Sequence, residues 1–375
     1  MMTRRSLIQK LGMTGGAVAA GLVAGTPAGA GPSAHSSFWM PEEAEPHLRT
    51  FMQWPVNRTV HPDRVFLDML QHSIANIANT IAEFEPVVML MDASHAKRAR
   101  QRLSNDVEIW DIPTDDLWCR DSGPLFVRNR DGELAVSHLN FNGWGNKQTH
   151  THDGRIARRV AERLDLPLLD NGLVGEVGGI DFDGHGTLIA HESSWINPNR
   201  NRGSKAEIED LMLEAFGAQK LIWAPGVKDA DITDYHIDAL ARFAAPGKIL
   251  IQMPDEIYPG DPWSRAAFET HDILAQAIDA QGRKLELVVI SESVAPRVKS
   301  QDFVASYVNF YVCNGAVIAA EFGDGEADEI AAATLADLYP GREIVMLNVD
   351  PVGEVGGGIH CATQQQPALQ ASVAD

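Results

Sequence analysis

Val174-Gly175-Glu176-Val177-Gly178-Gly179-Ile180 recurs almost unchanged near the end of the chain, as Val352-Gly353-Glu354-Val355-Gly356-Gly357-Gly358-Ile359. A glycine-rich coincidence is one interpretation. The other is that both stretches are corresponding turns of a pseudo-symmetric array, in which a repeated unit packs around a centre. A propeller-like architecture places such turns at one end of a central channel, where a site can form.

The chain around these stretches alternates strand-like and helix-like segments. Apolar runs predict strands at residues 107–112, 134–141, 220–224, 249–253, 285–290 and 343–349, and helical spacing predicts helices at 154–166, 204–216 and 326–338. Asn314-Gly315 between two apolar runs predicts a hairpin, which makes Cys313 a hairpin residue rather than a catalytic one. The sequence therefore predicts an α/β chain with mixed strand directions.

The helix at 204–216 has the clearest boundaries. Ser204 and Glu207 form a predicted capping box at its start, and Gly217 supplies the C-terminal stop.

The composition is that of a soluble globular enzyme, with 45% hydrophobic and 22% charged residues in a chain of 375. The formal net charge of −20 argues against nucleic acid or an anionic membrane as a partner and mildly favours cationic ligands. The three cysteines, Cys119, Cys313 and Cys361, cannot all pair within one molecule, so one thiol is free unless chains pair. A homodimer is compatible with these observations.

The N-terminus predicts export. Arg4-Arg5 is followed by an uncharged Gly/Ala-rich stretch at 11–24, and Ala28-Gly29-Ala30 offers small residues for cleavage. We expect a twin-arginine-type signal peptide at residues 1–30, a linker at 31–37, a single catalytic domain at 38–370, and a periplasmic location. The stretch is too short and too weakly apolar for a membrane span, and no other segment is long and apolar enough.

Four segments concentrate polar residues among apolar residues and glycines. They are residues 118–124, 176–179, 234–238 and 356–361. Together they provide a nucleophile, a base and three carboxylates. The thiol of Cys361 has an ordinary pKa of about 8.5, so a nearby cation or base must poise it. His236 can transfer protons, and Glu176 can orient His236 or raise its basicity.

The surplus of carboxylates predicts a cationic substrate. A guanidinium group is planar, presents several N–H donors and stays protonated. Asp121 and Asp238 can hold such a group through charge-assisted hydrogen bonds, and the bound cation in turn favours the thiolate of Cys361.

The chain resembles agmatine deiminases and the related bacterial-type peptidylarginine deiminases of the guanidino-group-modifying superfamily. The resemblance covers residues 40–367, almost all of the chain that would follow the signal. The motifs that carry it are Met40-Pro41-Glu42-Glu43, Trp54-Pro55, the segment Trp118 to Pro124, Phe141-Asn142-Gly143-Trp144-Gly145, Asn197-Pro198-Asn199-Arg200-Asn201, Thr233 to Asp238, Gly356 to Cys361, and Gln364-Gln365-Gln366-Pro367.

This resemblance implies a five-bladed, pseudo-symmetric α/β propeller of the pentein type, with the site in its central channel. It also implies hydrolysis of a guanidine to a ureido product and ammonia, without metal or organic cofactor. Carried over residue by residue, Cys361 is the nucleophile, His236 the general acid/base and Glu176 its partner, while Asp121 and Asp238 hold the guanidinium.

The leading hypothesis is conversion of agmatine to N-carbamoylputrescine in putrescine biosynthesis. The alternative is an extracytoplasmic deiminase of peptidyl-arginine or free arginine that gives citrulline. Free arginine would need a cation for its carboxylate, and Arg200, Arg202 and Arg242 are available for it. Trp118 is expected to bind substrate.

Three tryptophans are candidates for lining the channel, with plain core packing as the other option: Trp118, Trp54 and Trp144.

Two departures from the family pattern affect substrate choice. Val177 stands where a glycine is usual, and so does Tyr235, which adds bulk beside His236.

Three other kinds of function are compatible with parts of this sequence. A zinc site would use His236, Asp238, His360 and Cys361, but no ligand spacing matches a familiar zinc motif. A non-enzymatic binder of guanidinium compounds would not need the complete set of Cys361, His236 and Glu176. A cysteine protease is disfavoured because nothing in the chain resembles an oxyanion-hole motif.

Overall fold

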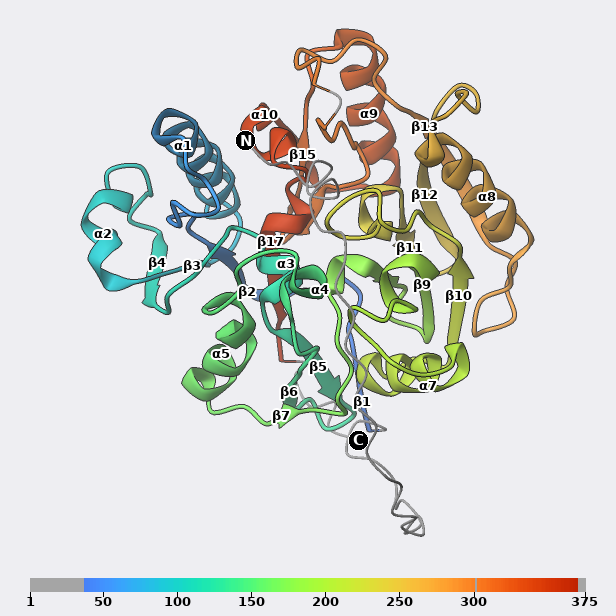
Figure 1. Cartoon of the computed structure of the whole chain (residues 1–375), viewed down its shortest axis with the longest axis horizontal. Helices are drawn as coiled ribbons and strands as arrows, with labels where there is room; N and C mark the ends of the chain where they lie inside the picture. The colour runs from blue at the N-terminus through green and yellow to red at the C-terminus, as the bar shows by residue number, and fades with distance from the viewer. Residues whose placement is uncertain (1–36, 301, 370–375) are drawn as a thin grey trace, which may run out of the picture.

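The structure, a computed structural model, describes residues 37–300 and 302–369. Five separate sheets with strands of both directions alternate with helices along this part of the chain, so the protein is a mixed α/β protein, as the sequence predicted. In Figure 1 the sheets are arranged around the middle of the molecule. The predicted signal, residues 1–30, lies outside the described residues, as does the linker up to residue 36.

The same three-strand unit occurs in every sheet. Its first strand pairs antiparallel with the second, and the second pairs parallel with the third. In chain order of their second strands, the units are β17 (Thr363–Pro367), β2 (His47–Gln53) and β3 (Val87–Met91); β5 (Leu125–Asn129), β6 (Leu134–Ser137) and β7 (Leu168–Leu169); β8 (Ile180–Phe182), β9 (Thr187–His191) and β10 (Lys220–Ala224); β11 (Ala241–Ala245), β12 (Lys248–Met253) and β13 (Glu286–Ser291); and β14 (Tyr311–Cys313), β15 (Ala316–Ala320) and β16 (Glu343–Leu347).

A helix joins the second strand to the third in each unit, because parallel neighbours need a crossover connection. These helices are α1 (Arg64–Ile81), α5 (Ile156–Leu164), α7 (Lys205–Phe216), α8 (Pro262–Gln276) and α9 (Gly325–Leu338). Figure 1 shows them on the outside of the molecule. Two further strands extend the sheets: β1 (Phe38–Trp39) pairs with β5, and β4 (Val107–Asp111), reached through α2 (Ala93–Ala99), pairs with β3.

The local predictions are largely confirmed. Ser204 and Glu207 make both bonds of the capping box at the start of α7, and Gly217 ends this helix with φ +64°. The hairpin forms between β14 and β15, with Gly315 at φ +82° in its turn and Cys313 in β14. The strand predicted at 134–141 is too long, because β6 ends at Ser137 and the chain has turned away by Asn140, whose φ is +47°.

A one-turn helix precedes the first strand of four units. These are α3 (Cys119–Ser122) before β5, and the 3-10 helices η4 (Val177–Gly179) before β8, η5 (Ile237–Ala239) before β11 and η6 (His360–Ala362) before β17. The helix α3 contacts η4 and η6, and η4 contacts η5. Four chain segments that are far apart in sequence thus meet at one place.

The repeated glycine-rich stretches are not corresponding turns in the way the sequence suggested. Glu176 is extended and leads into η4, whereas Glu354 is the last residue of the helix α10 (Asp350–Glu354). Ile180 begins β8, but Ile359 still precedes η6. The structural counterpart of η4 is η6. The residues that match in sequence therefore do not occupy equivalent positions in the structure.

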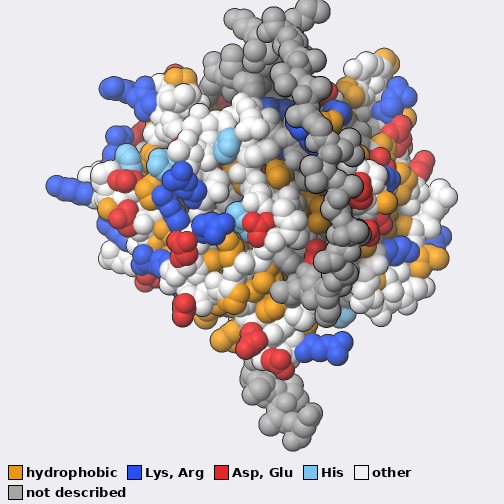
Figure 2. Space-filling model, turned by 60° about the horizontal axis from the view of Figure 1, so that its bottom comes forward, with side chains coloured by type: hydrophobic (Ala, Val, Ile, Leu, Met, Phe, Trp, Pro, Cys, Tyr) orange, Lys and Arg blue, Asp and Glu red, His pale blue; other side chains and the backbone are white. Residues whose placement is uncertain are grey.

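The core lies between the sheets and the outer helices, and the strands β3, β9 and β15 are buried along their whole length. On the face shown in Figure 2, Lys and Arg side chains lie among Asp and Glu side chains, so the excess negative charge does not form a single acidic patch there. Within the described residues, no helix combines the length and the apolar character needed to cross a bilayer.

Candidate active site

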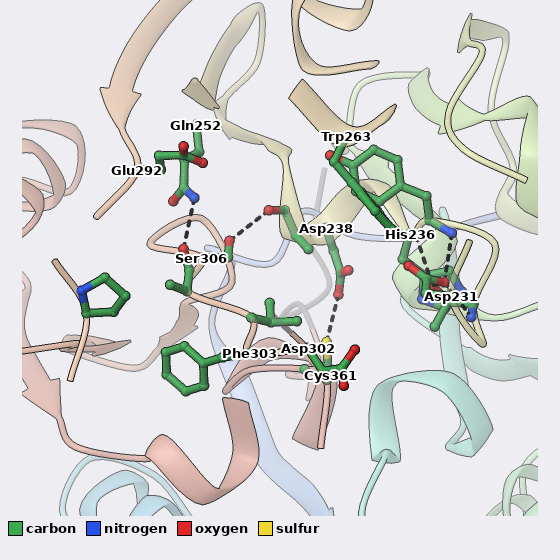
Figure 3. Close-up of a pocket in the computed structure, with 18 of the residues that line it drawn as sticks. Asp231, His236, Asp238, Gln252, Trp263, Glu292, Asp302, Phe303, Ser306 and Cys361 are labelled. Atoms are coloured by element: carbon green, nitrogen blue, oxygen red, sulfur yellow. Dashed lines mark hydrogen bonds between the residues drawn. The ribbon is translucent and has the colours of Figure 1, made fainter. Parts of the chain in front are cut away.

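Cys361 lies in η6 (His360–Ala362), three residues after the run Gly356-Gly357-Gly358. The residue is only 3% exposed, and it reaches a cavity of about 320 Å³ (Figure 3). Asn309 holds it from two sides: the Asn309 side-chain N–H donates to Sγ at 3.2 Å, and Asn309 Oδ1 accepts from the backbone N–H of Cys361 at 3.3 Å. A Cβ on Gly358 would lie 2.4 Å from Asn309 Oδ1, so this close approach requires glycine.

The cavity wall is acidic. Besides Cys361, His236 and Trp263, its described lining residues include four carboxylates but no lysine or arginine. The four carboxylates are Asp231, Asp238, Glu292 and Asp302. A cation is therefore the ligand that this wall favours.

His236 lies between two carboxylates. Its Nε2 is 3.2 Å from Glu176 Oε2, and its Nδ1 is 3.6 Å from Asp121 Oδ1. Burial by itself opposes a charged imidazole, but the charge of Asp121 and the hydrogen bond with Glu176 raise the pKa of His236 above its ordinary value. His236 is thus more protonated near neutral pH than a free histidine, and it can both stabilise a thiolate and donate a proton.

Arg200 holds Glu176 from behind. Its Nε lies 2.8 and 2.9 Å from the two carboxylate oxygens of Glu176, and its Nη1 lies 2.7 Å from Asp234 Oδ2, which also contacts Lys147 Nζ at 2.8 Å. Burial opposes ionisation of Glu176, but the charge of Arg200 and the hydrogen bond with His236 lower its pKa overall. Glu176 is therefore a fixed anion that orients His236.

The backbone that leads into His236 is unusual. Asp234 and Tyr235 have φ of +58° and +69°, a left-handed conformation that costs a non-glycine residue about 1–3 kcal/mol. The ring of Tyr235 stacks on His191 at 4.6 Å between centroids and lines the cavity. The side chain of Tyr235, which the sequence places beside His236, is therefore part of the cavity wall.

Gly178 lets three functional groups converge. A Cβ at this position would lie 2.7 Å from Asp121 Oδ1, 2.8 Å from His236 Nδ1 and 3.2 Å from Asp238 Oδ2. The other oxygen of Asp121, Oδ2, accepts from Trp144 Nε1 at 2.8 Å. The sequence-predicted residues Asp121, His236 and Asp238 are thus brought together around a residue that must lack a side chain.

Asp238 links this group to the thiol. Its Oδ2 lies 3.6 Å from Cys361 Sγ and 2.8 Å from His360 Nδ1. Its Oδ1 is buried and has no hydrogen-bond partner among the described residues. Burial opposes ionisation, but the hydrogen bond and the charge of His360 lower the pKa of Asp238. One oxygen of an ionised, buried carboxylate is therefore left for a ligand.

The other two thiols are poor candidates for the nucleophile. Cys119 and Cys313 are both fully buried. Burial raises the pKa of Cys313 to about 12 and that of Cys119 further still. Because the thiolate is the reactive form, neither thiol is suited to chemistry at neutral pH.

Core packing, one of the two options for the tryptophans, is what the structure shows, also for Trp118, which the sequence predicts to bind substrate. Trp54, Trp118 and Trp144 are all buried in the core, and none of them is among the described residues that line the cavity. Trp118 instead lies behind the wall, where its ring packs against Gly357. Trp263, at the start of α8, is the tryptophan that lines the cavity.

Sequence reasoning overlooked Asn309 and assigned Arg200 a different role. Arg200 belongs to the motif at residues 197–201, whereas Asn309 belongs to none of the quoted motifs. A hydrogen bond between residues 52 positions apart, or an ion pair between residues 24 positions apart, leaves no signal in sequence spacing. Asp121 and Glu176 also stand behind the described lining residues rather than among them, in contact with His236.

This arrangement joins a thiol, an imidazole of raised pKa and several carboxylates around one end of a cavity. Such a set can hold a planar cation, attack its carbon and move protons. Among the described residues, no group of three or more His, Cys, Asp and Glu side chains is placed to hold a metal ion, so the zinc hypothesis has no geometric support there.

Comparison with known proteins gives consistent matches over the whole described domain. Residues 39–367 match the model of the Porphyromonas-type peptidyl-arginine deiminase family. An agmatine deiminase of Medicago truncatula is 32% identical, with 88% of this chain and 97% of that protein covered.

Solved structures agree in fold. The agmatine deiminase of Enterococcus faecalis matches with a TM-score of 0.82 at 26% identity, covering 90% of this chain and 98% of that chain. The C. jejuni agmatine deiminase with substrate bound matches with a TM-score of 0.78 at 23% identity, covering 88% and 96%, and shows likeness in fold alone.

The convergence around Gly178 predicts how Cys361 responds to charged reagents. Chloroacetamidine, a cation, should alkylate Cys361 faster than neutral chloroacetamide, because the carboxylate of Asp238 beside the thiol favours a cation. In Gly178→Ala the added methyl group pushes Asp121 and His236 apart, so this advantage should fall about tenfold, the effect of losing one charge-assisted hydrogen bond. The ratio of the two alkylation rates measures it.

Gly325→Ala is the matched control, because a Cβ there meets no atom within 4 Å and Gly325 begins the distant helix α9. Its ratio should equal that of the unaltered protein. An unchanged ratio in Gly178→Ala would show that the three groups do not act together on a bound cation.

Proposed function

The chain belongs to the Porphyromonas-type peptidyl-arginine deiminase family, and on this premise we propose that it converts agmatine to N-carbamoylputrescine and ammonia. It is a C–N hydrolase that acts on guanidino groups. The observation that carries the choice of agmatine is the cavity wall, in which the described residues supply four carboxylates and no cationic side chain. In this proposal the product supplies putrescine synthesis.

Agmatine suits this wall because it carries two positive charges, a guanidinium and a terminal ammonium, and no carboxylate. Asp238 stands at the thiol end. Glu292 lines the cavity away from it, and burial together with the charges of Asp261 and Asp255 raises the pKa of Glu292. A neighbouring ammonium would relieve this crowding of negative charge.

Free arginine suits the wall less well, because its carboxylate needs a cation. Two of the three arginines considered for that task are already paired inside the protein. Arg200 binds Glu176, and Arg242 Nη2 lies 2.9 Å from Glu43 Oε1. Arg202 is exposed and does not line the cavity. Peptidyl-arginine has no such carboxylate and stays the nearest competitor.

In the first half of the proposed reaction, Asp238 holds the guanidinium beside Cys361, and the negative charge of Asp121 supports it from behind the lining residues, next to His236. The thiolate adds to the guanidinium carbon and forms a C–S bond. His236 then donates its proton to the departing nitrogen, the C–N bond breaks, and ammonia leaves. The result is a covalent amidino-cysteine. The pairing of Glu176 with both Arg200 and His236 supports this role for the imidazole.

In the second half, the now neutral His236 takes a proton from water. The resulting hydroxide adds to the amidino carbon. The C–S bond then breaks as the C=O bond of the ureido group forms, and the proton of the added hydroxyl passes to solvent. The thiolate of Cys361 is thereby restored, and the ureido product leaves. Trp118 contributes to substrate binding through Gly357, whose backbone it supports from behind the cavity wall.

Ammonia release from agmatine, free arginine and an arginyl peptide tests the substrate proposal. We expect the highest kcat/KM with agmatine, because only this substrate matches the acidic wall with two positive charges and no carboxylate. Cys361→Ser should abolish turnover of all three. Cys313→Ser is the control and should keep wild-type activity, since that thiol is buried in β14. If agmatine were the poorest substrate, the agmatine proposal would be wrong.

Glu176→Gln tests the role of His236. The charge and hydrogen bond of Glu176 help to raise the pKa of His236, so their loss should lower that pKa. The imidazole would then lose its proton at lower pH. The alkaline limb of the kcat/KM profile should therefore move toward lower pH by about one unit. Glu162→Gln, at an exposed position of α5, should leave the profile unchanged. A shift toward higher pH would contradict the assignment.

We also propose that the five sheets are the blades of a pseudo-symmetric propeller of the pentein type. Two features support this proposal: the same three-strand unit occurs in each sheet, and the one-turn helices that carry site residues precede the first strands of four of them. The candidate site then lies at the axis, where all blades meet.

Export is a further proposal, and its support is the sequence of residues 1–30 alone. Replacement of Arg4 and Arg5 by lysine should leave the protein in the cytoplasmic fraction of the cell, because the signal depends on the arginine pair rather than on charge. Lys10→Arg should not alter the distribution. Equal amounts of the double-lysine variant and the unaltered protein outside the cytoplasm would contradict export by this route.

A further inference from the structure

Glu43 is a carboxylate with a side chain only 11% exposed, and the proposed reaction gives it no task. It belongs to the motif Met40-Pro41-Glu42-Glu43, and two arginines hold it: Arg242 Nη2 lies 2.9 Å from Oε1, and Arg120 Nη2 lies 3.1 Å from Oε2. The backbone N–H of Val312 also donates to Oε1 at 2.9 Å. Residues from four distant parts of the chain therefore meet at one carboxylate.

His360 connects Glu43 to the site. Its Nε2 lies 2.9 Å from Glu43 Oε2, and its Nδ1 lies 2.8 Å from Asp238 Oδ2. The residue is 2% exposed and directly precedes Cys361. The imidazole thus bridges a carboxylate outside the site and the one that contacts the thiol.

Both ends of this bridge are carboxylates. Burial opposes ionisation of Glu43, but the charges of Arg242 and His360 bring its pKa well below the ordinary value, and the pKa of Asp238 is also lowered. An ionised carboxylate can only accept hydrogen bonds. Each ring nitrogen of His360 therefore faces an acceptor oxygen, a geometry that suits donation from both nitrogens.

We infer that Glu43 and His360 form a positioning relay, in which a doubly protonated His360 ties Asp238 to Glu43 and keeps Asp238 turned toward the substrate beside Cys361. Neither residue touches the reacting atoms. The inference rests on the proposed function for the role of Asp238, and it adds two residues that this function requires without contact to substrate.

The relay accounts for the unequal use of the two oxygens of Asp238. Oδ2 is occupied by His360 and faces Cys361 Sγ at 3.6 Å, whereas Oδ1 is buried without a hydrogen-bond partner among the described residues. A carboxylate free to rotate would exchange these positions. The bond from His360 keeps the open oxygen directed at a ligand.

Other charged groups face the relay from the surrounding elements. Arg120 in α3 also donates from Nε to the backbone oxygen of His360, and Asp181 in β8 lies 3.6 Å from Arg242 in β11. His236 faces Asp238. Of these groups, His360 is the one that lies between Asp238 and Glu43. A His360 variant therefore removes the proposed positive charge next to Asp238 and the thiol.

His360→Asn and His360→Gln separate the two ends of the relay. An Asn side chain places its amide N–H near the former Nδ1 and can still donate to Asp238, whereas a Gln side chain reaches toward Glu43 instead. Both side chains lack the positive charge proposed for His360.

Two quantities are measured. One is the pH dependence of Cys361 alkylation by iodoacetamide, with the modified residue located by mass spectrometry, and the other is kcat/KM for agmatine. Circular dichroism identifies folded variants, and either variant alone suffices if the other does not fold.

We expect the midpoint of alkylation to move to higher pH in both variants, because a thiolate is less favoured when a neighbouring cation is lost. We expect kcat/KM to fall about tenfold to hundredfold, the effect of losing a hydrogen bond to a charged group, and to fall further in His360→Gln than in His360→Asn. His271→Asn, which removes a surface histidine paired with Asp272, should change neither readout.

A folded variant with the wild-type midpoint would overturn the relay, whether or not kcat/KM falls, because a purely structural role changes activity without changing the titration of the thiol. Failure of the proposed function looks different. In that case the unaltered protein does not turn over agmatine, while the shift in the alkylation midpoint between it and the His360 variants still reports on the relay.

Discussion

Ionised carboxylates buried beside a thiol are costly unless cations or hydrogen-bond donors offset their charge, and this constraint shapes the whole centre of the molecule. Arg200 offsets Glu176 and Asp234, and the ring of His360 contacts Asp238. Each of these partners comes from a different part of the chain than the carboxylate it contacts. Asp238 Oδ1 has no hydrogen-bond partner among the described residues, and a guanidinium is the kind of group that can supply one.

The fold meets this constraint by using one position repeatedly. In four of the five sheets the chain makes a single helical turn before entering the first strand, and these turns, or the residues that cap them, carry Asp121, Glu176, His236, Asp238 and Cys361. The fifth sheet contributes Asn309 from the residues just before β14. Repetition of a simple unit thus brings different side chains to one site. Gly178 and Gly358 allow these side chains to approach one another closely, because a Cβ at either position would meet them.

Much of this could be predicted from the sequence because it is local. The capping box of α7, the hairpin at Asn314-Gly315 and most strands follow from short patterns, and the family motifs contain the site residues. The rest depends on distant contacts. The glycine-rich repeat suggested symmetry in the wrong register, and the placement of Trp118 behind the wall and of Trp263 in it depends on packing that no motif encodes. Arg200 looked like a free cation until its partner Glu176 was located in space.

The antiparallel pairing of β17 with β2 joins the two ends of the described chain in one sheet, and Cys361 lies immediately before β17. Among the described strands, β17 is therefore made last, although its partner β2 is one of the first. A growing polypeptide can build the other four sheets before Cys361 has been added to it. A chain that stops before β17 lacks both this thiol and one strand of the sheet that β2 belongs to.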